Sequence, residues 1–337
     1  MERKKNAIRN IWWGTINKLI LTVIPFITRT VIIKVLGNEY LGLNSLFTSI
    51  LDILNLTELG ISSAIIFFMY KPIAEKDEKT ISALLNLYKK LYRIIGIIIL
   101  TIGLVILPFL RNFIKGSVPD GINIYILYLI YLINTVSTYW LFAYKKSLML
   151  AFQRNDIISN INSALVIIKT IFQVTMISIF KNYYLYVIIN PVITITENII
   201  CNIITNKYYP QYVPRGTISK EIKNGIKKKV YGLMIHRACI STRNSLDSIF
   251  ISAFLGLNMV AIYNNYYYIM TAVKSFLGVI TGSIVSGVGN SITTESVSKN
   301  YNDMNKFNFM YMLIAGWCTI CLLCLYQPFM ELWVGQE

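Results

Sequence analysis

The sequence has few charged residues for its length. Only 14% of its 337 residues are Asp, Glu, Lys or Arg, whereas a soluble domain carries about 25%. Apolar runs of roughly 20 residues, the length needed to cross a bilayer core of about 30 Å, recur along the chain instead. The low charge and the apolar runs exclude a soluble domain and predict a polytopic membrane protein.

The apolar runs also lack the residue alternation of a membrane β-barrel. The long Ile and Leu runs do not alternate with polar residues, so the predicted fold class is an all-α polytopic membrane protein. We predict nine spanning helices, at approximately 11–36, 40–70, 82–110, 122–150, 157–180, 184–205, 230–256, 259–290 and 306–330.

Acidic residues are scarce, with 16 Asp and Glu against 32 Lys and Arg. With the N-terminus placed inside, 22 basic residues fall in inside segments and three in outside segments. Positive charge gathers on the cytoplasmic side of membrane proteins. We therefore predict a multi-pass membrane protein with a cytoplasmic N-terminus, and no nucleic-acid partner. We expect the first apolar run to be a retained helix, because no small-residue cleavage site follows it.

Groups for catalysis or metal binding are also scarce. Cys318, Cys321 and Cys324 lie in one apolar helix without a nearby His or acid, which predicts packing and no metal site. A polymerase or ligase of lipid-linked sugars would need a large outer loop with catalytic groups. The longest predicted outer loop, 111–121, has about a dozen residues. We therefore expect a protein that is not an enzyme and has no cofactor.

The chain contains an internal repeat. TVIIKVLGNEYLGLNSLFTSI, from Thr30, aligns without a gap on IFISAFLGLNMVAIYNNYYYI, from Ile249. The offset of 219 residues pairs Gly37 with Gly256, Gly42 with Ala261, Ser45 with Asn264, and 62–80 with 281–299. Six predicted helices separate the copies, so both have the same orientation. This predicts a two-lobed transporter with parallel six-helix repeats and the substrate between the lobes.

The repeat divides the chain into three parts. We assign 1–206 to an N-lobe of six helices, 207–229 to a cytoplasmic basic linker, and 230–337 to a partial C-lobe of three helices. KEIKNGIKKK, residues 220–229, is either an amphipathic helix on an anionic membrane surface or a solvated linker. We expect the chain to be truncated at its C-terminus, because the second lobe has half the helices of the first.

Charged residues inside the predicted spans form stripes. A charge at the bilayer centre costs about 2.5–3.5 kcal/mol, so such residues face a cavity or a partner. Three helices carry a polar face: Lys18, Thr22, Pro25 and Arg29 in the first, Asn44, Thr48, Asp52 and Asn55 with Glu58 nearby in the second, and His236, Arg243 and Asp247 with Asn244 in the seventh. We expect these stripes to line a hydrated central cavity.

Structural alternatives remain open for several of these charges. Arg243 and Asp247, four residues apart, could neutralise one another, and Lys18 could extend to the membrane interface. Lys274 suits cavity lining and helix pairing equally, and Glu197 is a candidate partner for Lys169. The spans hold seven basic and four acidic residues, and a net positive cavity suits an anionic cargo such as pyrophosphate.

The stretch NIWWGTINKLILTVIPFITRTVIIKVLGNEYLGLNSLFTSILDILNLTELG and the later STRNSLDSIFISAFLGLNMVAIYNNYYYI resemble the oligosaccharide flippases of bacterial polysaccharide synthesis. These are the O-antigen and capsular repeat-unit exporters of the multidrug/oligosaccharidyl-lipid/polysaccharide exporter superfamily. The resemblance implies a two-lobed transporter that moves an undecaprenyl-pyrophosphate-linked sugar unit outward by alternating access. It also implies a cationic cavity to which Lys18, Arg29 and Arg243 correspond best.

The site expected from these observations has two parts. The substrate-binding candidates are Lys18, Arg29, Asn55, Arg243, Asn244 and Lys274. The candidates for coupling to an H⁺ or Na⁺ gradient are Asp52, Glu58 and Asp247. The expected partners are lipid-linked oligosaccharide, membrane lipids and other polysaccharide synthesis proteins. A multidrug antiporter of the same superfamily is the alternative, and it would export cationic dyes and rely mainly on acids.

Overall fold

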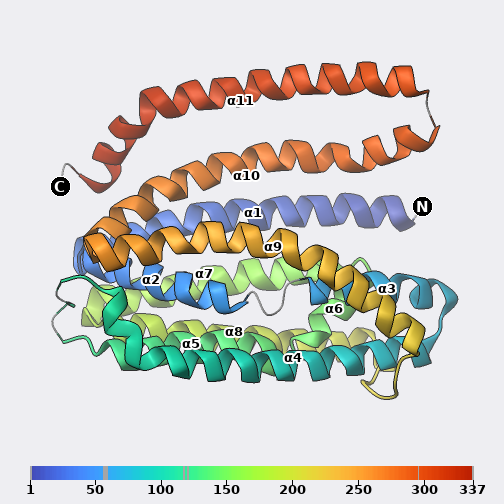
Figure 1. Ribbon diagram of the computed structural model, residues 1–337, viewed down its shortest axis with the longest axis horizontal. Helices are drawn as coiled ribbons and strands as arrows, with labels where there is room; N and C mark the ends of the chain where they lie inside the picture. Colours follow the sequence, from blue (N-terminus) through green and yellow to red (C-terminus); the bar gives the residue numbers. More distant parts are fainter. Residues whose placement is uncertain (1, 56–59, 117, 120, 295, 336–337) are drawn as a thin grey trace. The chain divides into compact units, whose positions relative to one another are not determined.

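The computed structural model describes residues 2–55, 60–116, 118–119, 121–294 and 296–335. Within these ranges the side chains of 2–11, 15, 235–238, 240–244 and 279–294 are left undescribed. The described residues form eleven α-helices and one 3-10 helix, joined mostly by short turns (Figure 1). The predicted all-α fold class is therefore confirmed.

The helices follow one another in the order of the predicted spans. They are α1 (Glu2–Val35), α2 (Asn38–Leu54), α3 (Ile61–Glu75), α4 (Glu78–Ile106), the 3-10 helix η2 (Leu107–Phe113), α5 (Ile124–Trp140), α6 (Tyr144–Ala151), α7 (Asn155–Phe180), α8 (Tyr183–Tyr208), α9 (Lys220–Leu255), α10 (Leu257–Thr294) and α11 (Val297–Val334).

Five helical segments in the described part of the chain are long and apolar enough to cross a membrane: α1 from Trp12, α4 with η2, α7, α8 and α11. Together α5 and α6 make a sixth, bent by 49° at the break between them. These segments make the chain a membrane protein. The other three predicted spans are also helical, 40–70 as α2 and α3, 230–256 within α9 and 259–290 within α10.

The predicted span 40–70 differs from the structure because it is two helices instead of one. Helix α2 ends at Leu54, and α3 begins at Ile61 after Gly60, which has a left-handed φ of 81°. A Cβ atom on Gly60 would lie 2.7 Å from the Leu233 Cβ on α9. Glycine therefore serves two purposes here, because it permits the left-handed backbone and the close approach of α9.

The basic segment 220–229 is helical but is not a helix of its own. Ser219 caps its start by accepting a hydrogen bond from the Ile222 N–H at 3.3 Å, and α9 continues from Lys220 to Leu255. Its first turns pack on α3, because a Cβ on Gly225 would lie 2.7 Å from the Phe68 ring. The segment thus begins a long helix, and its contact with an anionic membrane surface stays a prediction.

The structure divides into two compact units, Met1–Ala261 and Ile262–Glu337. In the first unit α1 packs against α7, α7 against α8, α5 against α8 and α4, and α2 against α9. The Phe47 ring, fully buried, packs edge-on against Tyr128 and Tyr131 of α5. In the second unit, the Tyr266 ring of α10 meets the Tyr326 ring of α11 at 5.3 Å. The predicted division into lobes remains a prediction.

The backbone confirms the register of the internal repeat at its first joint. Gly37 has φ 104° and ψ 169°, and Gly256 has φ 93° and ψ 175°. The Gly37 N–H donates to the carbonyls of residues 32 and 33, and the Gly256 N–H donates to those of residues 251 and 252, at 3.1–3.2 Å. Each bond therefore recurs at the offset of 219 residues.

The same register holds much further along the chain. Asp77 caps α4 by accepting from the Thr80 N–H at 3.0 Å, and Ser296 caps α11 by accepting from the Lys299 N–H at 3.3 Å. Helices α4 and α11 consequently begin 219 residues apart, at 78 and 297. Past their ends, Gly116 with φ 90° and Gly335 with φ 96° keep the offset, which extends the repeat beyond the residues that the sequence had paired.

Candidate functional site

A polar cavity lies inside the first unit, between α2, α5, α7 and α8. Its volume is about 370 Å³, within the range of ordinary ligand sites. Leu51 is the one apolar residue among the twelve that line it; the others are Asn44, Thr48, Asp52, Asn55, Tyr131, Asn134, Thr135, Thr138, Lys169, Tyr186 and Asn190. Polar groups are expensive inside a membrane helix bundle, so this concentration makes the cavity the candidate site for a polar ligand.

Helix α2 contributes a carboxylate and an amide held together. The Asp52 carboxylate accepts a hydrogen bond from the Asn55 side chain, and the Asn55 Oδ1 accepts one from the Tyr139 hydroxyl at 3.0 Å. The bond from Tyr139 fixes the orientation of the amide, which in turn positions the carboxylate. Two residues singled out in the sequence, Asp52 and Asn55, are thus brought together in the cavity.

Three more asparagine side chains in the lining have their carbonyl oxygens occupied. The Oδ1 of Asn44 accepts from the Tyr131 hydroxyl at 2.6 Å, that of Asn134 from Thr194 at 2.8 Å, and that of Asn190 from Gln173 at 3.2 Å. An Asn side chain whose oxygen accepts a hydrogen bond still has its NH₂ group, which can donate. Within the described residues these three NH₂ groups have no hydrogen-bond acceptor, so the cavity is rich in donors.

The wall opposite α2 is held rigidly. Gln173 of α7 is almost fully buried, and its Nε2 also donates to the Tyr186 carbonyl of α8 at 3.1 Å. On the α5 side, the Tyr131 hydroxyl lies 3.2 Å from the Tyr183 hydroxyl, which donates to the Tyr40 carbonyl at 3.1 Å. Buried side chains with satisfied hydrogen bonds keep the donors of the cavity in place.

One cation lines the cavity, and a second lies near a lining residue. Lys169 of α7 lines it directly and forms no ion pair with any carboxylate that the structure describes. The expected pairing of Lys169 with Glu197 is wrong, because Glu197 Oε1 lies 2.7 Å from Lys146 Nζ. The half-buried Arg29 of α1 is close enough for its charge to act on the phenol of Tyr186, so positive charge reaches the cavity from two helices.

Comparison with known proteins decides the family. A family model described as polysaccharide biosynthesis protein matches residues 7–285, most of the chain. This chain belongs to the polysaccharide biosynthesis protein family. No curated protein and no solved structure matches it. Members of this family are generally transporters, and with the spanning helices the membership gives the chain a general role in polysaccharide export.

The other residues predicted for the site of this polysaccharide biosynthesis protein lie elsewhere or cannot be placed. Lys18 and Asp247 are exposed on α1 and α9 and do not line the cavity, and Lys274 is exposed on α10 in the second unit. The side chains of Arg243 and Asn244, and Glu58 as a whole, lie outside the described residues. A role for these six residues therefore stays a prediction.

Sequence reasoning missed the contributions of α5 and α8 to the site of the polysaccharide biosynthesis protein. Tyr131, Asn134, Thr135 and Thr138 line the cavity at i, i+3, i+4 and i+7, and Tyr186 and Asn190 at i, i+4. The same spacing had identified the stripe on α2. The stripe on α5 was overlooked because it carries no charge.

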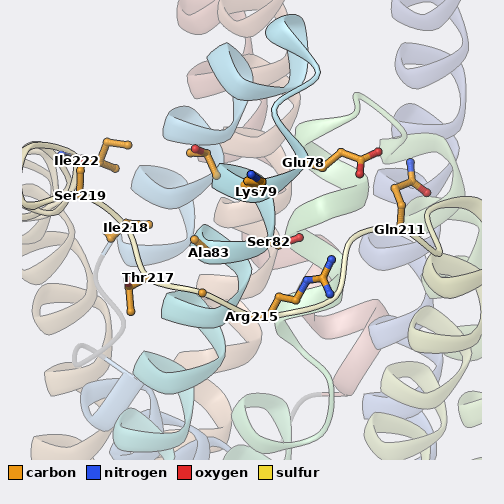
Figure 2. A pocket seen from close by; sticks show the side chains of 12 residues that line it. Glu78, Lys79, Ser82, Ala83, Gln211, Arg215, Thr217, Ile218, Ser219 and Ile222 are labelled. Carbon is orange, nitrogen blue, oxygen red and sulfur yellow. Dashed lines mark hydrogen bonds between the residues drawn. The ribbon is translucent and has the colours of Figure 1, made fainter.

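A second cleft, of about 690 Å³, lies where the chain 211–222 crosses the start of α4. Figure 2 shows its lining, with side chains from α4 on one side and from the extended chain on the other. Asn86 donates to the Gly216 carbonyl at 2.8 Å and fastens the crossing segment. The cleft mixes Glu78, Lys79 and Arg215 with small side chains, so it has no uniform charge or donor pattern. The polar cavity is the better candidate site of the polysaccharide biosynthesis protein.

Proposed function

We propose that this protein is a flippase that carries undecaprenyl-pyrophosphate-linked oligosaccharide repeat units across the bacterial cytoplasmic membrane by alternating access. The observation that supports it best is the donor-rich cavity inside the first unit. Pyrophosphate oxygens accept hydrogen bonds only, and sugar hydroxyl and ring oxygens are also acceptors. A cavity with an ammonium group and three amide NH₂ groups that donate to no described residue suits such a cargo.

We assign the cations and the amides of the cavity to different parts of the cargo, according to the groups that each can bind. Lys169 and Arg29 supply positive charge for the pyrophosphate, and Arg243 is expected to add to it from α9. The amides of Asn44, Asn134 and Asn190 donate to sugar oxygens. In the inward-open form the headgroup enters the cavity while the lipid tail stays in the bilayer, so no hydrocarbon chain passes through polar surroundings.

Among the described residues, Asp52 is the one carboxylate in the cavity lining, and we assign it to coupling. A carboxylate that binds H⁺ or Na⁺ loses its negative charge, which changes the balance with the nearby cations and hence the affinity for an anionic cargo. Asp52→Asn should abolish the dependence of transport on the coupling gradient. Unchanged pH and sodium dependence in Asp52→Asn, Glu58→Gln and Asp247→Asn would remove the coupling assignment.

The decisive experiment measures lipid-linked oligosaccharide inside cells that lack the gene. The cells are complemented with the natural protein, Lys169→Met, Asn190→Leu or the control Lys181→Met. Lys181 ends α7 in a left-handed conformation outside the span, so its loss removes the same charge without touching the cavity. Protein amounts in the membrane are compared first, so that failure to fold is not counted as failure to transport.

We expect lipid-linked oligosaccharide to accumulate in the absence of the gene and with Lys169→Met. The natural protein and Lys181→Met should restore export. Asn190→Leu should give partial accumulation. Lack of accumulation without the gene, together with sensitivity to cationic dyes, would contradict the proposal and favour the multidrug antiporter. Full export by both cavity variants would remove the cavity from the substrate path.

A further inference from the structure

Three basic side chains gather around Tyr144, where α6 meets α4. Lys89 Nζ and Lys145 Nζ lie 5.8 and 5.9 Å from the centre of the Tyr144 ring, and the charge of Arg93 acts on the Tyr144 hydroxyl. The charges of Lys89 and Lys145 also act on each other. We call Lys89, Arg93 and Lys145 the α4–α6 cationic cluster.

The α4–α6 cationic cluster has no carboxylate to balance it among the described residues. Lys145, which is buried, donates to the neutral Asn206 Oδ1 at 2.7 Å. The neighbouring Lys146 pairs with Glu197, with 2.7 Å between Nζ and Oε1, so that this carboxylate does not balance the cluster. Three like charges around one buried tyrosine repel one another, and an anion placed among them would relieve the repulsion.

The position of Arg93 along α4 indicates how deep the α4–α6 cationic cluster lies in the membrane. Residues 94–110 of α4 and η2 carry no charge, and at 1.5 Å per residue they extend for roughly 25 Å, close to the thickness of a hydrocarbon core. Arg93 therefore lies at the level of the lipid headgroups on the side where the basic residues concentrate. Ile94, Ile97 and Ile98, which follow it, are exposed and lie where lipid tails would run.

The bend between α5 and α6 brings the cluster together. Phe142 has a left-handed φ of 56°, an uncommon conformation for a large side chain. Trp140 lies just before it, donates to the Arg93 carbonyl at 3.3 Å, and lies so close to α4 that a Cβ on Gly96 would be 2.1 Å from its indole nitrogen. The bend holds α6 against α4 and places Lys145 beside Lys89.

We propose that the α4–α6 cationic cluster binds the phosphate of an anionic phospholipid from the cytoplasmic leaflet. Arg93 offers paired N–H donors to phosphate oxygens, Lys89 adds a point charge, and Trp140 suits the headgroup region. The site is made by α4 and α6, whereas the polar cavity is made by α2, α5, α7 and α8, so this site stands apart from the cavity and does not depend on the proposed transport function.

Native mass spectrometry of the full chain with added phosphatidylglycerol tests the site. The double variant Lys89→Ala/Arg93→Ala is compared with Lys79→Ala/Lys90→Ala, which removes two charges from exposed positions on the same helix. We expect the natural protein and the control to retain one phosphatidylglycerol that the cluster variant loses, with an apparent Kd at least tenfold weaker in the variant. The conservative variant Lys89→Arg, which keeps both charges and the paired donors of Arg93, should keep the lipid.

Equal retention by the natural protein and the cluster variant would overturn the proposal, and so would an equal loss in the control, which would show a general charge effect. A second arm adds undecaprenyl pyrophosphate, since its phosphates share the same chemistry. If it displaces the retained phosphatidylglycerol at equimolar amounts, the cluster belongs to the cargo and the lipid assignment is wrong. Continued retention of phosphatidylglycerol supports the assignment.

Discussion

Gly37 and Gly256 hold the same backbone conformation at equivalent joints, with φ near 100° and ψ near 170°. This region of backbone space is almost closed to residues with a Cβ atom. Each glycine ends one long helix and allows the next to begin within two residues. The tight joint is therefore a property of the repeat itself and occurs in both copies.

Gly37→Ala should lower the thermal stability of the protein. A Cβ on Gly37 meets no atom within 4 Å, so the cost comes from backbone strain alone, about 1–3 kcal/mol. Gly232→Ala is the control, because it also meets no atom but lies inside α9, where Ala is favoured over Gly. Thermal unfolding in detergent, followed by size-exclusion fluorescence, should show a lower midpoint for Gly37→Ala than for the natural protein. The midpoint of Gly232→Ala should not be lowered. Equal midpoints would mean that the joint tolerates an ordinary residue.

Gly96→Ala should be destabilising in a way that a second substitution repairs. The added methyl group would collide with the indole of Trp140, at 2.1 Å from its nitrogen, and overpacking of this kind costs about 1–3 kcal/mol. Trp140→Leu in the same chain makes room, so the double variant should unfold at a higher temperature than Gly96→Ala alone. Additive losses in a double-mutant cycle would show that the two residues do not interact.

Glu197→Gln should destabilise the first unit by leaving Lys146 without its partner. The pair is 2.7 Å apart and both side chains are mostly buried, with 28% and 21% exposed. Loss of one partner from such a pair costs about 1–3 kcal/mol. The double variant Lys146→Met/Glu197→Met, which removes both charges, should recover much of the loss in thermal unfolding. If the single variant unfolds like the natural protein, the pair contributes nothing.

Acid should weaken the start of α4 but leave the start of α11 unchanged. Hydrogen bonds from the Thr80 hydroxyl and N–H hold the pKa of Asp77 below its usual range. A lowered folded-state pKa means that the stabilisation is complete above about pH 4, the pKa of an unfolded Asp, and disappears as the pH falls through the folded value. Ser296, the equivalent cap, does not titrate.

The pH prediction is checked by the unfolding midpoints of the natural protein and Asp77→Ser at pH 6 and pH 3. Serine retains an oxygen that caps the helix but carries no charge. The midpoint of the natural protein should fall more on acidification than that of Asp77→Ser. Parallel falls in both would show that the cap does not sense pH.

The hydrophobic pattern was enough to predict the helices and the repeat. Their apolar runs are long, and Gly37 and Gly256 stand at equal distances from recognisable neighbours. The interruption at Gly60 was not predicted, and the close approach of Leu233 from α9 to this glycine is a contact between distant residues that leaves no local pattern. The continuation of 220–229 into α9 was missed because its lysines resemble a surface segment.

The site was predictable only where charge marked it. Asp52 and Asn55 stood out on α2, whereas Asn134 and Asn190 did not, since isolated amides in apolar helices often serve helix packing. Glu197 was a candidate partner for Lys169, yet it binds Lys146 across the bundle. Partner choice between helices depends on their packing, which the order of residues does not reveal.

The contact between Gly42 and Leu257 has a consequence for biosynthesis. A Cβ on Gly42 would lie 2.2 Å from the Leu257 carbonyl oxygen, so α2 needs the beginning of α10 to complete its packing. The ribosome adds about 5–20 residues per second, so the intervening stretch of roughly 215 residues takes on the order of ten to forty seconds to emerge. During that interval α2 is already made, but its face at Gly42 is not yet covered by the start of α10.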